Sequence, residues 1–598
     1  MSEVNAARQA SRWLSAFADA LSRRDIQAAT AAFAEECYWR DMVAFTWNIV
    51  TNEGQASIAA MLKETLARVQ PTKWALDGPV SAANDVIETW FTLETTAGRG
   101  RGHLRLKGDK CRTLLTTLGE LKGFEERSGE TREAGTEHGA FKNRVTWQQR
   151  RKIEQTELGY SRQPYCLIIG GGQGGLALGA RLKRLNVPAL IVDKHPRAGD
   201  AWRKRYESLC LHDPVWYDHM PYLPFPDHWP VFTPKDQIGD WLEMYAKVME
   251  LNFWPSTECK TAQYDEGTGE WHVTVDRAGE TITLRPRHLV LATGMSGVPH
   301  RPRFPGHEAF RGAHHHSSDH PGGTAYAGKK CVVVGSNNSA HDICADLWEH
   351  GADVTMVQRS PTLVVRSETL VRLAVGRLYS ETALKAGITT EKADFTVASI
   401  PFRLAPDLQK PIYERIKQED AVFYEGLRAA GFMLTFGEDE SGLSSMYMRR
   451  GAGYYIDVGA SQLIADGRIK LRSGVGIDRL TERAVVLSDG SVLDADLIVY
   501  ATGYSSMNSW AAQLISQDVA DKVGKCWGLG SGTNKDPGPW EGELRNMWKP
   551  TRQDALWFQG GNLAQSRFYS LLLGLQLKAR LEGIPTPVYG LAQVHHRD

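Results

Sequence analysis

The chain of 598 residues carries 70 Lys plus Arg against 70 Asp plus Glu, and 42% of its residues are hydrophobic. This balance leaves no basic excess of the kind that binds nucleic acid or an anionic membrane surface. The longest apolar runs, such as SLLLGLQL, fall short of the roughly 20 residues that a membrane span needs. Eight scattered cysteines without a C-x-x-C pair, and a polar N-terminus, favour a cytoplasmic protein with reduced thiols.

A chain of this length exceeds one hydrophobic core, and its first 125 residues predict a small α+β domain. The amphipathic stretches ASRWLSAFADALSRRD and IQAATAAFAEE predict two helices, and VIETWFTLETT, GRGHLRLKGDK and CRTLLTTLGELKGFEE predict consecutive antiparallel strands. Residues 126–160 are charged and poor in apolar side chains, which is typical of a solvated linker. Beyond residue 160, strands, glycine-rich turns and helices alternate, which predicts an α/β fold.

The stretch PYCLIIGGGQGGLALGARLKRLNVPALIVDKHP carries a dinucleotide-binding pattern. An apolar strand runs into glycines in G-x-G-x-x-G spacing, and a helical segment and a second strand ending in an acid follow. The first glycine suits a tight turn, the second lets backbone approach a pyrophosphate, the third allows close helix packing, and the acid suits ribose hydroxyls. The helix N-terminus offers free N–H groups to the phosphates. The predicted cofactor-binding residues here are Gly170, Gly172, Gly174, Gly175, Asp193 and Lys194.

A second, degraded copy lies in CVVVGSNNSAHDICADLWEHGADVTMVQRS, where the spacing becomes G-x-N-x-x-A. Asn tolerates left-handed backbone angles better than other non-glycine residues, and Ala340 is small enough for close helix packing. The second strand ends in Arg359, which suits a 2′-phosphate where an acid would repel it. A surface arginine that merely follows a strand is the alternative. The predicted cofactor-binding residues here are Gly335, Asn337, Ser339, Arg359 and Ser360.

Two dinucleotide folds in one chain predict a pair of cofactors that exchange hydride, FAD in the first fold and NADPH in the second. Two further apolar strands run into A-T-G, and we expect these to be the crossings where the chain leaves and re-enters the FAD domain. The residues concerned are Thr293, Gly294, Thr502 and Gly503.

The fold class expected is therefore α/β, with an NADP domain of residues 326–484 inserted in an FAD domain of residues 161–325 and 485–598. Both would be Rossmann-like, and the N-terminal α+β domain would precede them. A helical insertion at about 370–450 is expected to shape or cover the substrate site.

Together with GDAWRKRYESLCLHDP and FRGAHHHSSDH, these motifs resemble the class B flavoprotein monooxygenases, and more narrowly the flavin-containing monooxygenases. The family fingerprint F-x-G-x-x-x-H-x-x-x-(F/Y), on the linker between the nucleotide domains, maps onto Phe310, Gly312 and His316, but its last position is His320. That departure and the N-terminal extension are similar to the type II subgroup, which is associated with Baeyer–Villiger oxidation of ketones and with use of NADPH or NADH. The first 120 residues resemble the cone-shaped NTF2/SnoaL-like fold.

The resemblance implies a reaction cycle in which NADPH reduces the flavin and O₂ then forms a C4a-peroxyflavin. As a nucleophile this species would convert small ketones to esters or lactones, and as an electrophile it would oxygenate sulfur or nitrogen. Heteroatom oxygenation, a plain NADPH oxidase and a non-catalytic flavin sensor remain the alternatives. A disulfide reductase would need a cysteine pair near the flavin, whereas Cys210 stands alone there. The partners expected are a small-molecule substrate and O₂, and a homodimer is one option for assembly.

The resemblance also implies roles for individual residues. Trp202 matches the G-x-W turn beside the flavin, with an ordinary core aromatic as the alternative. His212 falls where many members carry an Asn near the flavin C4a edge, and a satisfied histidine under the flavin is equally open. Gln565 and Arg567 are similar to residues of the helix that closes the FAD domain, whose N-terminal turn faces the flavin ring. The candidate catalytic residues are Trp202, His212, His316 and His320.

Two features are expected to be structural. Three adjacent histidines at 314–316 suggest a metal, but neighbours on an extended strand point to opposite faces and no Cys or acid accompanies them at ligand spacing, so no metal site is predicted. Asp41 lies in a fold type that includes isomerases with a catalytic acid, yet we favour a gating, packing or dimer role for it.

Overall fold

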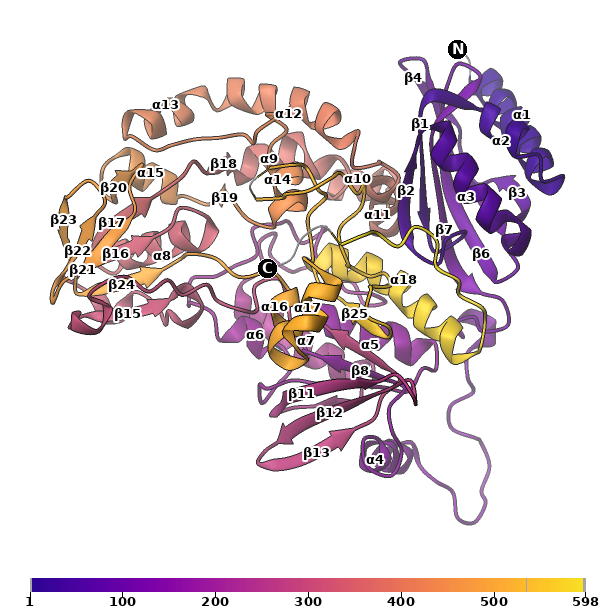
Figure 1. Ribbon diagram of the computed structural model, residues 1–598, viewed down its shortest axis with the longest axis horizontal. Coiled ribbons are helices and arrows are strands. Elements are labelled where there is room, and N and C mark those ends of the chain that lie inside the picture. The colour runs from indigo at the N-terminus through magenta and orange to yellow at the C-terminus, as the bar shows by residue number, and fades with distance from the viewer. Residues whose placement is uncertain (1–2, 534, 595–598) are drawn as a thin grey trace.

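The computed structural model describes residues 3–533 and 535–594. In Figure 1 the N-terminal part, in indigo and violet, is a curved sheet with α1–α3 on its outer side. Antiparallel β5, β6 and β7 and the two expected helices are present, although the second helix ends at Ala31 and residues expected in it begin a strand. The sheet order is β2-β1-β7-β6-β5-β3, with β4 on β5. The elements are α1 (Glu3–Ser22), α2 (Ile26–Ala31), β1 (Phe33–Met42), β2 (Ile49–Glu53), α3 (Gly54–Val69), β3 (Thr72–Leu76), β4 (Ser81–Ala83), β5 (Val86–Glu94), β6 (Gly98–Lys107) and β7 (Lys110–Leu121).

Aromatic side chains fill the space between α1 and this sheet. The Phe17 ring lies 4.8 Å from Trp13 and 5.6 Å from Trp39, measured between centroids. Asp41 is fully buried there, where the Thr46 hydroxyl (2.7 Å), the Thr116 hydroxyl (2.6 Å) and two backbone amides donate to its carboxylate. Burial raises the pKa of Asp41 to about 6, and these hydrogen bonds oppose the rise. The contacts favour the packing role.

The first nucleotide sheet is all parallel, in the order β10-β9-β8-β14-β25. Its central strands are fully buried, which explains their uninterrupted apolar sequences. A helix that follows β8 and the long closing helix α18 pack against each other on it. The elements are β8 (Cys166–Ile169), α5 (Gln173–Arg184), β9 (Ala189–Val192), β10 (Phe253–Trp254), β14 (His288–Leu291), β25 (Leu556–Phe558) and α18 (Leu563–Leu581).

The second nucleotide sheet is also parallel, in the order β15-β24-β16-β17-β20. It corrects our domain boundaries at two points. The histidine tract, which we placed on the linker between the two nucleotide domains, is strand β15 of this sheet. Strand β24, which we placed in the first domain, pairs with both β15 and β16. A buried apolar strand looks the same in sequence whichever sheet it joins. The elements are β15 (Ala313–His316), β16 (Lys330–Val334), α8 (Asn338–Glu349), β17 (Asp353–Gln358), β20 (Lys470–Ser473) and β24 (Leu497–Tyr500).

Helices occupy much of the stretch around 370–450, as expected, and Figure 1 shows α10 and α11 between the second nucleotide fold and the N-terminal sheet. The expected linker contains an exposed helix, α4 (Trp147–Glu157), capped by Thr146. No helix among the described residues is long and apolar enough to cross a membrane. The elements of the helical stretch are β18 (Leu363–Arg366), α9 (Ser367–Leu373), α10 (Glu381–Lys385), α11 (Thr390–Ala398), α12 (Ala405–Glu419), α13 (Ala421–Ala429), α14 (Leu443–Arg450) and β19 (Tyr454–Asp457).

Smaller elements complete the two nucleotide folds. Two three-stranded antiparallel sheets, β11-β12-β13 and β21-β22-β23, lie outside the parallel sheets. Their elements and the remaining helices are α6 (Asp200–Arg203), α7 (Lys235–Val248), β11 (Thr257–Asp265), β12 (Glu270–Arg277), β13 (Glu280–Leu284), α15 (Ala460–Ala465), β21 (Ile477–Leu480), β22 (Ala484–Leu487), β23 (Val492–Asp494), α16 (Asn508–Leu514) and α17 (Gln517–Val523).

A buried ion pair joins the N-terminal sheet to the rest of the molecule. Arg40 of β1 donates to both carboxylate oxygens of Glu543, at 2.6 and 2.7 Å. The same guanidinium donates to the Ala398 carbonyl at the end of α11 (2.7 Å) and to the Tyr569 hydroxyl of α18 (3.2 Å). The Arg40 side chain therefore connects β1 to three other segments, which contain Glu543, the end of α11 and α18.

Candidate functional site

The first glycine-rich turn has the shape that a pyrophosphate needs. Gly170 has φ +108° and packs on the next strand, so a Cβ there would lie 2.4 Å from the Ala292 carbonyl oxygen. A Cβ on Gly175 would lie 1.9 Å from the Gly170 carbonyl oxygen, so this glycine lets α5 approach β8. By contrast, a Cβ on Gly172 would meet nothing within 4 Å. Gly172 therefore borders open space at the N-terminus of α5.

Acidic, aromatic and hydroxyl side chains surround this turn as the sequence predicts. Asp193, after β9, accepts hydrogen bonds from the Gly171 amide (2.6 Å) and the His195 amide (2.8 Å). The Trp202 indole donates to Gln173 at the start of α5, at 3.1 Å. The buried Thr293 hydroxyl has no hydrogen-bond partner among the described residues. An open turn and an unpartnered hydroxyl fit a bound dinucleotide, here FAD.

The remaining residues predicted at this turn lie in three different environments. Gly174 is buried, and a Cβ on it would sit 3.4 Å from Gly560. Lys194 is exposed. Gly294, in the first A-T-G, has φ +82° and leaves the strand in a left-handed turn.

The second glycine-rich turn repeats this geometry with one correction. Gly335 has φ +132°, and a Cβ there would lie 2.3 Å from the Ala501 carbonyl oxygen. Asn337, however, has φ −97° and is extended, so the left-handed tolerance that we invoked for it is not used. Gly172 is extended in the first turn as well. The third position of the motif therefore needs a small or absent side chain for access, and not an unusual backbone angle.

The side chains predicted to bind the second cofactor differ in exposure. Ser339 lies partly buried in the first turn of α8, and Ala340 is buried. Arg359 and Ser360 are exposed directly after β17. No ion pair engages Arg359 among the residues that the structure describes, which leaves its guanidinium available to a phosphate group.

A short segment of the first fold reaches α8 of the second. The Tyr206 hydroxyl donates to Asp342 at 2.8 Å, and the His212 imidazole lies 3.4 Å from the same carboxylate oxygen. Burial lowers the pKa of His212, but the hydrogen bond and charge of Asp342 outweigh it, so the net shift is upward. Since Trp202 contacts the start of α5, residues 202–212 connect the N-terminal regions of both nucleotide-binding helices.

His316 is fully buried and fixes the second A-T-G turn. Its Nε2 donates to the Gly503 carbonyl at 3.0 Å, and its Nδ1 accepts from the Ser318 amide at 3.1 Å. Burial lowers the pKa of His316, which agrees with a neutral ring. The Thr502 hydroxyl donates to the His300 carbonyl. These contacts give His316 a role in positioning the backbone of the second A-T-G turn, and its part in catalysis stays a prediction.

His320 does not reach either glycine-rich turn. Its Nδ1 lies 3.0 Å from His315, its Nε2 lies 4.0 Å from Asp346 near the far end of α8, and its ring stacks on Tyr326. These surroundings favour a packing role for the position where the family fingerprint carries an aromatic residue.

Gln565 sits in the first turn of α18, in a capping box with Asn562. The Tyr447 hydroxyl of α14 donates to its side-chain oxygen at 3.0 Å. Gln565 therefore connects the closing helix to the helical stretch that we expected over the site.

Sequence reasoning missed two acidic residues at this site, Asp342 and Asp394. Asp342 joins the two folds, and Arg567 of α18 forms a bidentate pair with Asp394 of α11 at 2.7 and 2.8 Å. The Arg567 guanidinium also donates to the carbonyls of Tyr217 and His219, just after the His212 loop. An Asp on a helix looks like surface charge in a sequence, and no local pattern marks these two as buried partners.

Comparison with known proteins agrees with this geometry. A family model described as pyridine nucleotide-disulphide oxidoreductase matches residues 167–399. Indole-3-pyruvate monooxygenase YUCCA1 of Oryza sativa subsp. japonica is 31% identical over 371 residues, which make up 60% of this chain and 82% of the relative. Probable indole-3-pyruvate monooxygenase YUCCA3 of Arabidopsis thaliana is 30% identical over 392 residues, or 63% of this chain and 79% of the relative.

Among solved structures, a flavin-containing monooxygenase from Stenotrophomonas maltophilia matches with a TM-score of 0.46 and 18% identity, covering 70% of this chain and 99% of that one. Because the match to the rice relative spans most of that protein, the chain belongs to the flavin-dependent monooxygenases. It is an oxidoreductase that uses FAD and NAD(P)H.

Proposed function

We propose that this monooxygenase inserts one oxygen atom of O₂ next to the carbonyl group of a small ketone, a Baeyer–Villiger oxidation that gives an ester or lactone. The observation that carries the proposal is the link between the two nucleotide folds. Trp202 contacts the start of α5 while Tyr206 and His212 contact α8, so two dinucleotides at the two turns would be held by one segment.

The chain's own groups would hold and orient the cofactors. FAD would lie with its pyrophosphate over Gly172 and its ribose near Asp193, and NADPH would place its 2′-phosphate at Arg359 and Ser360. Bound FAD supplies the redox chemistry and the activation of O₂. NADH remains an alternative donor, because Arg359 is exposed and contributes binding mainly when a phosphate is present.

The substrate class rests on chemistry that the relatives suggest. Indole-3-pyruvate, which the relatives' names give as their substrate, is a 2-oxo acid and therefore a ketone. The candidate site also offers Asp213 beside His212, and burial raises the pKa of Asp213 to about 6. A carboxyl that titrates near neutral pH can take up or release a proton beside the carbonyl.

Oxygenation of sulfur or nitrogen is the second candidate, and one observation favours it. Asp342 raises the pKa of His212 and so favours a protonated imidazole, whose proton would promote electrophilic oxygen transfer to a soft nucleophile.

We further propose that residues 1–125 form an NTF2-like domain with a structural role, and that the protein works in the cytoplasm, with a homodimer as one option.

The test compares NADPH consumption by the FAD-loaded protein with no substrate, with cyclobutanone and with methyl phenyl sulfide, under ¹⁸O₂. We expect ketone-stimulated turnover and one ¹⁸O atom in the lactone. Sulfoxide without lactone would favour the second candidate. Consumption that no substrate stimulates, with hydrogen peroxide equal to the NADPH used, would exclude both and identify an oxidase.

A further inference from the structure

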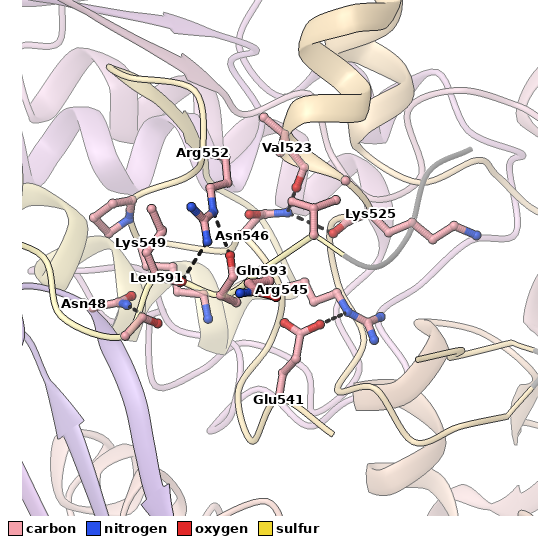
Figure 2. Close-up of a pocket in the computed structure, with 15 residues that line it drawn as sticks. Asn48, Val523, Lys525, Glu541, Arg545, Asn546, Lys549, Arg552, Leu591 and Gln593 are labelled. Atoms are coloured by element: carbon pink, nitrogen blue, oxygen red, sulfur yellow. Dashed lines mark hydrogen bonds and ion pairs between the residues drawn. The ribbon is translucent and has the colours of Figure 1, made fainter. Parts of the chain in front are cut away.

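A pocket lies where the end of the chain crosses between the N-terminal sheet and the body of the molecule (Figure 2). We call residues 589–594 the C-terminal strap. The Tyr589 amide donates to the Thr46 carbonyl at 2.9 Å, and the Asn48 amide group donates to the Tyr589 carbonyl at 2.9 Å. On the other side, Arg552 donates to the Leu591 and Ala592 carbonyls. The strap is therefore fastened at both edges and forms one wall of the pocket.

The charges that line this pocket are unequal. Four basic residues and one acidic residue are among those that line it, namely Lys525, Arg545, Lys549, Arg552 and Glu541. Arg545 is neutralised, because it donates to Glu541 at 2.7 Å and to Asp536 at 2.9 Å. Arg552 is exposed and donates to the backbone of the strap.

Lys549 has neither a hydrogen bond nor an ion pair within the described ranges 3–533 and 535–594, although it is partly buried. The nearest carboxylates are already engaged, since Arg40 binds both oxygens of Glu543 and Arg545 binds Glu541. Desolvation lowers the pKa of Lys549, and Glu543 and Glu541 oppose this shift without reversing it. A desolvated ammonium group without a counter-ion is stabilised by any anion that can reach it.

We propose that this pocket binds a small organic anion, a carboxylate or a phosphate ester with a short apolar body, and that Lys549 is its principal charge partner. The cavity volume is about 40 Å³, which leaves room for a small anionic head group. Its apolar lining residues are Val523, Pro550, Leu591 and Val594. Arg552 lies at the exposed edge, where it can meet the anion as it enters.

A chain of contacts leads from this pocket to the FAD turn. Trp548, next to Lys549, donates from its indole to the Gly560 carbonyl at 3.2 Å. Gly560 in turn packs against Gly174 of the first glycine-rich turn. The anion site thus adds to the proposed function without depending on which substrate is oxygenated.

The test is a thermal-shift titration of the FAD-loaded full-length protein with butyrate, its neutral isostere butyramide, and inorganic phosphate, at constant ionic strength. We expect a saturable rise in Tm with butyrate or phosphate and none with butyramide. Response to one anion alone identifies the head group and supports the site. Lys549→Met should weaken the affinity by about tenfold or more, and Lys549→Arg should retain most of it.

Lys522→Met is the matched control, since Lys522 lies close by on α17 and lines a neighbouring recess with Arg552. Equal midpoints for the native protein and Lys549→Met would overturn the proposal, as would equal stabilisation by butyramide or a loss of affinity in Lys522→Met as large as in Lys549→Met. Because Tm reports binding whether or not any substrate is turned over, failure here is distinguishable from failure of the proposed oxygenation.

Discussion

His320 illustrates how burial decides the protonation of a single residue. It is 1% exposed, and burial together with the adjacent His315 lowers the pKa of His320 from 6.5 to about 4. Between pH 6.5 and about pH 4, His320 binds a proton in the unfolded chain but not in the folded chain. The free energy of unfolding therefore falls as the pH drops through this range. The contribution is lost on acidification and not at high pH.

We therefore expect His320→Phe, which retains an aromatic ring against Tyr326, to reduce the acid loss of stability. The slope of the unfolding free energy between pH 6.5 and 4 should become shallower by about 1.4 kcal/mol per pH unit. Urea denaturation over that range measures it, and His272→Phe on the exposed face of β12 is the control. An unchanged slope in His320→Phe would mean that His320 already binds a proton in the folded state.

Arg359 is the residue on which cofactor preference is expected to depend. In Arg359→Ala, the KM for NADPH should rise by about tenfold or more, because a charge-assisted contact to the 2′-phosphate is lost. The KM for NADH should stay within about twofold, since NADH lacks that phosphate. Arg472→Ala, on the neighbouring strand β20, controls for the general positive potential. Parallel changes for both cofactors would place the 2′-phosphate elsewhere.

At the scale of elements, the first glycine-rich turn separates folding from cofactor binding. Gly175→Ala brings a Cβ to 1.9 Å from backbone that cannot move away, so this variant should yield little folded protein. Gly172→Ala meets open space at an ordinary φ of −79° and should fold with a cofactor-free Tm close to that of the parent. Its Cβ would stand where the pyrophosphate is expected, and FAD affinity should fall by about tenfold. Measuring the FAD content after purification together with the Tm distinguishes the two variants. Full FAD content in Gly172→Ala would contradict the placement of the pyrophosphate at Gly172.

The glycine-rich turns were predictable because their requirements are local. The motif comprises a strand, a tight turn and the start of a helix within about ten residues. Steric limits at each position restrict which residue types can occur there. The membership of β15 and β24 in the second sheet was not predictable, because strand pairing depends on partners far along the chain. For the same reason Asp342 escaped notice, although the two residues that it joins to α8 were within the recognised motifs.

For the molecule as a whole, the Arg40–Glu543 pair determines how the N-terminal sheet is attached. Arg40→Met should destabilise the protein by about 3–5 kcal/mol, because Glu543 would remain buried without its partner. The double variant Arg40→Met with Glu543→Gln should recover much of that loss. Urea denaturation measures both. Arg101→Met, which removes an exposed ion pair with Glu391 across the same interface, should change stability by no more than about 1 kcal/mol.

If the single and double variants at Arg40 and Glu543 were equally destabilised, the cost would lie in lost packing and not in an uncompensated charge. The sequence could predict that residues 1–125 form their own α+β unit, but not this attachment. Both partners look like ordinary surface charges, and they come together only when segments from opposite ends of the chain are folded.

The pairing of β14 with β25 bears on the order of assembly during synthesis. Leu289 pairs with Leu556, so the last strand of the first parallel sheet emerges from the ribosome only after the whole second nucleotide fold. Until then β14 presents an unpaired apolar edge, which is open to pairing with another chain. Such high contact order predicts slow folding and a premature-termination product that aggregates. Truncation before residue 556 should therefore yield insoluble protein, even though both glycine-rich turns are already present.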